Sequence, residues 1–587
     1  MKTSNFSPLR ALTVGLCTLL LCGSLPPVAW AAPLPTLDPG RVQVPDASGM
    51  RSSPSEMPGT LELPPSTITP DQPRLRDVPP AEPELKTDAA FAVTRVVLDG
   101  VTSYPAGTFQ TLLAGLEGRT VTLAEVNDVA GRITQRYRQA GFLLARTLVP
   151  AQRLEGGELH IRVIEGRVNQ VKIQGPTSRA MERYAQNIEQ EVPIRGQTLE
   201  RNLLLMNDLP GNEAHGTLSA SQDREGTDLD IANKQRRVEG FIGFDNRDSR
   251  YFGPWQGYGG IGINDLTGIG DQLSLRYGRS LEGDKMAFYE GQYELPVGGQ
   301  GTMLSFLAQH NDGRADTWSV LNANSSGDTF AVRLTHPWVR SRAETFKTSV
   351  AFSWYNGRSE YLDEPDLAPS SDDRIRALRL GASWDYSDSH GGRNLLKGEL
   401  SQGLDVLGAS SEQRLNPSRT GGQTDFTRLQ LDAQRIQDLG WITPGLNLYL
   451  AISGQTSFGD ALLTPEQFGV GGSQFGRGYD PSEIAGDNGL AGKVELQYNR
   501  QHRIGDHELP TQYYAYWDVG KVWNEEPRET SSESLASAGL GVHLQVAPDM
   551  YLSPELAFPL TRSVSAEELD GDNGKEPRLY LNFIKLF

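Results

Sequence analysis

An arginine between two glycines is the first feature of this sequence that could do chemistry. It lies in the run Gly476-Arg477-Gly478-Tyr479, where the glycines permit a tight and unusual backbone. Further along, the run Tyr516-Trp517-Asp518-Val519-Gly520 carries an acid. A guanidinium is a rigid fork that suits a carboxylate, and an unpaired acid at low dielectric is costly. If the arginine-bearing loop folds inward, Arg477 is therefore the expected partner of Asp518.

Both residues also have simpler explanations. Arg477 could lie on the surface of a glycine-rich turn, and Asp518 could bind water in a polar interior. Successive side chains on a strand point to opposite faces. One face of the second segment carries Tyr514, Tyr516, Asp518 and Gly520, and the other carries Tyr513, Ala515, Trp517 and Val519. We assign the first face to a polar lumen and the second to lipid.

The elements that must position these residues form a long series of alternating segments. Within 237–587, strand candidates start near Val238, Trp255, Asp271, Met286, Gly301, Thr329, Phe346, Arg374, Arg393, Thr424, Gly445, Gly489, Gln512, Leu535, Met550 and Arg578. A sandwich would show the same alternation in any single strand. Sixteen candidates behind a secretory signal favour a transmembrane β-barrel of 16 antiparallel strands with a polar lumen. Residues 455–487 then form the sixth external loop.

The region before the barrel divides into a leader and a linker. Residues 1–31 have a basic start, an apolar stretch and an Ala29-Trp30-Ala31 cleavage site, which predicts a secretory signal peptide. A lipoprotein signal at Cys22 is a weaker alternative, because Leu21 precedes it. Residues 32–88 contain thirteen prolines, so we expect an extended linker.

Two small α+β modules follow, at 89–166 and 167–236. In the first, Thr122 and Glu125 form a capping box that opens a helix with apolar residues on one face, and strands are expected at 92–98, 143–149 and 160–164. In the second, a strand at 168–173 precedes helices near 180–191 and 199–209.

These features together resemble the outer-membrane transporters of two-partner secretion, which are related to the BamA-type assembly proteins. That family has a signal peptide, a linker, two polypeptide-transport-associated (POTRA) modules and a sixteen-stranded barrel. Its loop motif V/I-R-G-Y/F is matched by Gly476 to Tyr479, and its strand motif F-x-D-x-G by Tyr516 to Gly520. Segments 148–152 and 199–211 add to the similarity. The resemblance implies that Arg477 and Asp518 form a lumenal ion pair that fixes the loop.

The resemblance also implies a function. Such a protein sits in the outer membrane of a Gram-negative cell, with its POTRA modules in the periplasm. It would bind an unfolded, large, β-rich partner protein (TpsA-like) and export it through the barrel. Outer-membrane lipid and, during biogenesis, the barrel assembly machinery are the other expected partners. A cytolysin, an adhesin and a contact-dependent toxin are all possible cargoes. Many family members carry a plug helix, which a proline-rich 32–88 segment does not favour.

Two other functions share part of this pattern. An assembly factor that inserts other barrels has the same fold and loop motif, but such proteins usually carry more than two modules. A solute porin lacks paired periplasmic modules, and an energy-coupled receptor should have a folded plug where residues 32–88 lie.

Composition excludes several other classes of function. The net charge of −18 makes nucleic-acid binding a poor expectation. Both cysteines, Cys17 and Cys22, lie in the predicted signal, so the mature chain has no thiolate for a metal. The sequence shows neither a phosphate-binding loop before a helix nor a nucleophile elbow. We therefore expect no catalytic residue, no metal and no cofactor.

Overall fold

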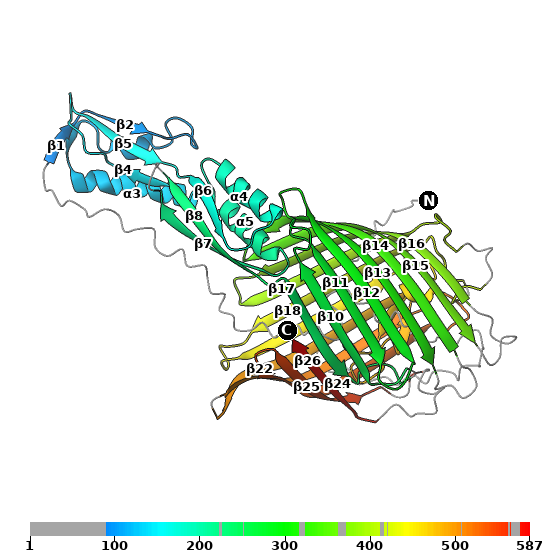
Figure 1. Ribbon diagram of the computed structural model, residues 1–587. Helices are drawn as coiled ribbons and strands as arrows, with labels where there is room; N and C mark the ends of the chain where they lie inside the picture. Colours follow the sequence, from blue (N-terminus) through cyan, green and yellow to red (C-terminus); the bar gives the residue numbers. More distant parts are fainter. Residues whose placement is uncertain are drawn as a thin grey trace, which may run out of the picture. The chain divides into compact units, whose positions relative to one another are not determined.

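A closed antiparallel barrel of sixteen strands forms the larger part of the chain that the structure describes (Figure 1). This computed structural model describes residues 90–221, 226–250, 252–315, 323–361, 371–410, 416–419, 421–505, 507–561, 564 and 576–587. The predicted signal peptide and linker lie outside these ranges. The expected strand number is confirmed. The barrel strands are β9 (Val238–Asp245), β10 (Gln256–Asn264), β11 (Gln272–Ser280), β12 (Met286–Val297), β13 (Thr302–Ala315), β14 (Ala323–Arg340), β15 (Glu344–Tyr361), β16 (Ser371–Ser387), β17 (Gly392–Gly403), β18 (Thr427–Asp438), β19 (Leu446–Thr456), β22 (Asn488–Ile504), β23 (His507–Trp523), β24 (Ser532–Ala547), β25 (Met550–Pro559) and β26 (Arg578–Leu586).

Alternation along β23 separates the two faces of the barrel wall. Tyr513 and Trp517 are 41% and 48% exposed, whereas Tyr514 and Tyr516 are buried and Asp518 is 0% exposed. A strand that faces hydrocarbon on one side and a packed interior on the other shows this pattern. The lumenal face of β23 is therefore the face that carries the acid.

The last strand closes the barrel against the first. β26 pairs antiparallel with β9 from Asn582↔Asp245 to Leu586↔Phe241. One residue further, Phe587 and Gly240 exchange two main-chain hydrogen bonds of 2.9 Å. A closed ladder leaves no unpaired strand edge in the membrane, which a spanning sheet requires.

Two small α+β modules precede the barrel. The first has a sheet of β2 (Arg95–Asp99), β5 (Glu158–Ile164) and β4 (Arg146–Leu148), a pair of β1 (Ala90–Val93) and β3 (Arg119–Thr122), and helices α2 (Gln110–Ala114) and α3 (Leu123–Gln139). The second has a sheet in the order β6 (Val168–Gln174), β8 (Thr227–Gln235) and β7 (Asn212–Ala220), with helices α4 (Arg179–Gln190) and α5 (Gly196–Asp208). Each module has its own apolar core.

Helix α3 shows how the sequence specifies one of these elements. The Thr122 side chain accepts from the Glu125 N–H, and the Glu125 carboxylate accepts from the Thr122 N–H. This reciprocal capping box satisfies main-chain donors that a helix start leaves free. Its buried face is Val126, Val129, Ala130, Ile133 and Tyr137, the face that the periodicity predicts.

The expectation of one strand over 92–98 was wrong. Thr94 instead bonds to the main chain of Gly156 and Gly157, which divides the segment into β1 and β2. β1 then pairs with β3 and β2 pairs with β5.

The second module contacts the turns at one end of the barrel. Arg201 of α5 donates to the main-chain oxygens of Gln300 and Pro337 at 3.0 and 2.6 Å. Asp208 accepts two hydrogen bonds from Arg340, at 2.6 and 2.7 Å. The connection between β19 and β22 lies at the opposite end of its strands, by the antiparallel order of the barrel.

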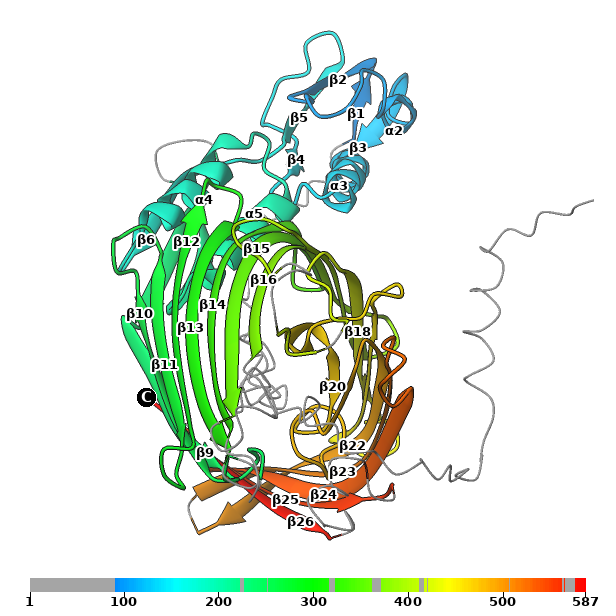
Figure 2. The ribbon, with the colours of Figure 1, turned by 90° about the vertical axis from the view of Figure 1, so that its right-hand side faces the viewer.

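That connection, residues 457–487, is the sixth loop on its side of the barrel and is called loop 6 below. It is two residues shorter at its start than the predicted 455–487, because β19 continues to Thr456. It contains the 3-10 helix η4 (Thr464–Glu466) and a short hairpin of β20 (Phe468–Val470) and β21 (Ile484–Gly486). Figure 2 shows β20 inside the ring of barrel strands. Loop 6 therefore folds inward.

Candidate functional site

The glycines beside Arg477 permit a close approach of loop 6 to the barrel wall. Gly476 has a φ of +79°, and a Cβ there would lie 2.5 Å from a Leu535 methyl group. A Cβ on Gly478 would lie 3.0 Å from Ser537 and from the Pro559 nitrogen. A side chain at either position would push the loop away from β24 and β25. The two glycines thus place Arg477 against the wall.

Arg477 binds two carboxylates of the lumenal wall. Asp518 accepts from the Arg477 main-chain N–H at 3.1 Å and from Nε and one terminal nitrogen at 3.0 Å each. Glu495 of β22 accepts from the other terminal nitrogen at 2.6 Å. All three side chains are buried. The guanidinium carbon lies 3.3 Å from the centroid of the Tyr516 ring. These residues, Arg477, Asp518, Glu495 and Tyr516, are called the Arg477 cluster below.

A third acid extends this cluster across the strands. Glu555 of β25 accepts hydrogen bonds from Tyr514 and Tyr516 at 2.7 and 2.9 Å. Arg247, in the connection after β9, pairs with Glu555 at 2.9 Å. Buried charges are tolerated when they are paired and hydrogen bonded. The lumenal wall near loop 6 therefore supplies a paired set of charges rather than isolated ones.

The remaining predicted site residues fix the loop around Arg477. Tyr479 is buried, and its hydroxyl donates to the Thr561 carbonyl and accepts from the Thr561 N–H. A Cβ on Gly520 would lie 2.5 Å from a Val470 methyl group, so this glycine makes room for β20. The structure thus brings all six residues, Gly476, Arg477, Gly478, Tyr479, Asp518 and Gly520, into one region.

Several charged partners of these residues lie outside the predicted motifs. Glu495 was not singled out, although it stands between Val494 and Leu496, which are 42% and 46% exposed to the lipid side. In the sequence, the signal that could have indicated Glu495 was an acidic residue on the inward face of a predicted barrel strand. Asp480, next to Tyr479, pairs with Arg250 at 2.6 Å and with Arg578. No local pattern indicated those two arginines.

None of the helices in the described ranges is both long and apolar enough to cross a membrane. Within those same ranges, the acidic, histidine and cysteine side chains form no group of three that could hold a metal ion.

Comparison with known proteins assigns the family. The family model of the haemolysin secretion/activation proteins ShlB/FhaC/HecB matches residues 225–544. The family model of the ShlB-type POTRA domain matches residues 91–166. The chain belongs to the ShlB/FhaC/HecB family. This assignment agrees with the resemblance predicted from the loop and strand motifs.

Three transporters from other bacteria are similar to this chain over most of its length. The heme/hemopexin transporter protein HuxB of Haemophilus influenzae (strain 86-028NP) is 23% identical, over 81% of this chain and 83% of that protein. The outer membrane transporter CdiB of Dickeya dadantii (strain 3937) is 25% identical, over 73% and 76%. The hemolysin transporter protein ShlB of Serratia marcescens is 24% identical, over 78% and 80%.

Two solved structures share the fold. CdiB from Escherichia coli matches with a TM-score of 0.70 at 19% identity, covering 87% of this chain and 93% of that one. CdiB from Acinetobacter baumannii matches with a TM-score of 0.60 at 16% identity, covering 86% and 91%.

Membership in the ShlB/FhaC/HecB family fixes the broad function. The chain is an outer-membrane β-barrel transporter of two-partner secretion, and its POTRA modules lie in the periplasm. It exports an exoprotein partner through the barrel. The end of the barrel that carries loop 6 therefore faces the cell exterior. Members of the family are transporters, not enzymes.

Proposed function

We propose that this transporter exports one large, β-rich, TpsA-like protein, and that loop 6 sets the closed state of its pore. The observation that carries this proposal is the position of Arg477. Its guanidinium lies between Asp518 and Glu495 on the lumenal wall, while the rest of loop 6 folds inward beside it. A chain that threads the barrel must displace the loop from this position.

The Arg477 cluster makes the closed state well defined. Removing one partner of a buried ion pair costs roughly 3–5 kcal/mol, because the other charge is left uncompensated. Loop 6 therefore prefers one seated arrangement over partly released ones. Displacement by the exported chain would release the whole cluster at once and expose its charges to water.

The POTRA modules would capture the partner in the periplasm. Each module sheet has three strands, and the strand order leaves β2 and β4 at the edges of the first and β6 and β7 at the edges of the second. An extended segment can add to such an edge through main-chain hydrogen bonds, while side-chain pockets give selectivity. Unfolded cargo offers the extended segment that this binding requires.

The energy for export would come from the partner itself. The sequence shows no nucleotide-binding motif, and folding of the cargo outside the cell removes it from the periplasmic equilibrium. We propose no enzymatic step, no metal and no cofactor. Residues 1–31, 32–88, 89–166, 167–236 and 237–587 are the proposed signal, linker, two modules and barrel. Outer-membrane lipid and, during biogenesis, the barrel assembly machinery are the other proposed partners.

The test is an Arg477→Ala variant assayed with its co-expressed partner protein. We expect export to fall to a few per cent of the parental level while the amount of folded barrel stays unchanged, measured by heat-dependent mobility in gels. Arg374→Ala is the matched control, because this arginine lies on β16 and pairs only with Asp372 among the ion pairs of the described residues. Normal export by Arg477→Ala would contradict the assigned role.

A further inference from the structure

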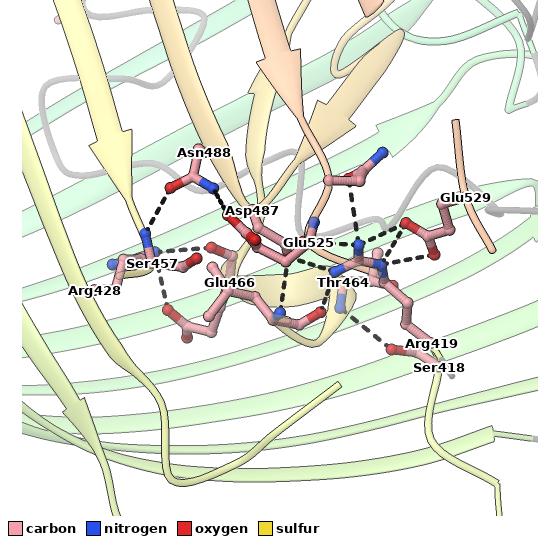
Figure 3. A network of polar contacts seen from close by, with 12 residues as sticks. Ser418, Arg419, Arg428, Ser457, Thr464, Glu466, Asp487, Asn488, Glu525 and Glu529 are labelled. Atoms are coloured by element: carbon pink, nitrogen blue, oxygen red, sulfur yellow. Dashed lines mark hydrogen bonds and ion pairs between the residues drawn. The ribbon is translucent and has the colours of Figure 1, made fainter. Parts of the chain in front are cut away.

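Loop 6 carries another buried charge that contacts barrel strands other than those that Arg477 contacts. Glu466, the last residue of η4, is 2% exposed. Its carboxylate binds Arg379 at 2.7 Å and Arg428 at 2.9 Å. Figure 3 shows Glu466 directed toward Arg428. These arginines stand on β16 and β18, the eighth and tenth barrel strands, whereas Asp518 and Glu495 stand on the thirteenth and twelfth.

Both arginines belong to the lumenal wall. Leu378 and Leu380, the neighbours of Arg379, are exposed on the lipid side, so Arg379 points inward. Between the two arginines, Glu399 of β17 lies 3.5 Å from Arg379 and 3.1 Å from Arg428. Two arginines and two carboxylates thus form a neutral set, called the Glu466 cluster below.

The polarity of this contact is opposite to that of the Arg477 cluster. At Arg477, loop 6 supplies the cation and the wall supplies the acids. At Glu466, loop 6 supplies the acid and the wall supplies the cations. If loop 6 were seated in the reverse orientation, like charges would meet at both places. Buried ion pairs are weak contributors to stability, and fixing register is their best-attested role.

Further hydrogen bonds and ion pairs connect loop 6 to neighbouring segments near Glu466. The side-chain amide of Gln455 donates to the main-chain oxygens of Glu466 and Asp487 at 3.0 and 3.1 Å. Asp487, the last residue of loop 6, pairs with Arg419 from the connection between β17 and β18. Arg419 also binds Glu529 from the connection between β23 and β24 (Figure 3). This side of loop 6 is therefore also held by hydrogen bonds and ion pairs.

We propose that Glu466 is a second positioning residue for export, which fixes loop 6 to β16 and β18 independently of Arg477. Loop 6 then spans the lumen between two charge clusters on different parts of the wall. The pore opens to a passing chain only when both clusters have separated. This inference rests on the proposed role of loop 6 in closing the pore.

The test measures ion current through the purified full-length mature protein in planar bilayers, without any partner protein. Glu466→Gln keeps the size of the side chain but removes its charge. We expect the fraction of time spent in conducting states to rise at least about tenfold, because two arginines lose a buried counter-charge. Asp372→Asn is the control, since Asp372 pairs with the half-exposed Arg374 near the start of β16. Its current should equal that of the parental protein.

A double-mutant cycle shows whether Glu466 acts through the arginines. In a background of Arg379→Gln and Arg428→Gln, adding Glu466→Gln should not raise the current further, because the attraction that holds Glu466 to the wall is already absent. Heat-dependent gel mobility verifies that each variant is folded. Unchanged current in Glu466→Gln, or a full additional effect in the arginine-free background, would overturn the inference.

The outcome is separable from that of the proposed function. Normal export by Arg477→Ala together with raised current in Glu466→Gln would contradict the export role of Arg477 but support the positioning role of Glu466. Lost export by Arg477→Ala with unchanged current in Glu466→Gln would support the export role of Arg477 and contradict the positioning role of Glu466.

Discussion

At the scale of single residues, Asp518 and Glu495 serve Arg477 unequally. Asp518 receives three hydrogen bonds from Arg477, one of them from its main chain, whereas Glu495 receives one. Asp518 therefore fixes both the backbone and the side chain of the motif arginine. Glu495 compensates the remaining terminal nitrogen, which would otherwise be buried without a partner.

A buried acid in the first module gives a prediction about pH. Glu165 accepts hydrogen bonds from the Thr102 and Ser103 main chain, from the Thr102 hydroxyl and from Tyr137. Burial alone would raise the pKa of its carboxyl, but these hydrogen bonds outweigh burial and hold the pKa below its ordinary value of 4.5. Charge on Glu165 is therefore favoured in the folded module.

Because the folded pKa is depressed, this stabilisation is present above about pH 4.5 and is lost as the pH falls through the folded value. Urea unfolding of a fragment spanning residues 89–236 should therefore show stability that declines below about pH 4.5. A Glu165→Gln fragment should be less stable at pH 7 and should decline less steeply in acid. Equal pH profiles for the two fragments would contradict the prediction.

At the scale of elements, two substitutions in and before helix α3 should change the stability of the first module in opposite directions. Replacing Thr122 with Ala removes one half of the capping box and should destabilise the first module by about 1 kcal/mol. Replacing Gly131 with Ala should stabilise it by about 0.5–1 kcal/mol, since an added Cβ meets nothing within 4 Å. Urea unfolding of the 89–236 fragment measures both. A destabilised Gly131→Ala fragment would refute the account of this helix.

The predictability of the elements follows their length and periodicity. The helix α3 could be predicted with its cap and its buried face, because seventeen residues repeat one pattern. The β20–β21 hairpin could not, since its strands have three residues each. Such short strands are set by packing against the wall: a Val470 methyl group, for example, fills the space above Gly520. The strand propensity of these short segments does not indicate that contact.

At the scale of the whole molecule, the modules and the barrel have separable tasks. Deleting residues 89–236 leaves every barrel strand and the closing pairs of β9 with β26 in place. We expect the shortened protein to reach the outer membrane as a folded barrel and to export less than a few per cent of its partner. Secreted partner and barrel mobility on gels measure the two effects. Export at the parental level would contradict the proposed capture step.

The barrel itself was the most predictable part of the chain. All sixteen strands begin within six residues of the predicted starts, because each strand alternates a lipid face with a lumenal face. The pairing of Arg477 with Asp518 was expected from the motifs. The pairing of Glu466 with Arg379 was not, because the two residues are 87 positions apart and neither lies in a distinctive local pattern. The inward fold of loop 6, rather than a sequence motif, brings them together.

Loop 6 is linked to four other external connections of the barrel. It bonds to Arg250 after β9, to Arg419 after β17 and to Thr561 after β25, while Arg419 joins it to Glu529. If loop 6 closes the pore as proposed, an antibody fragment that binds one of these external connections would hold loop 6 in place from outside the cell.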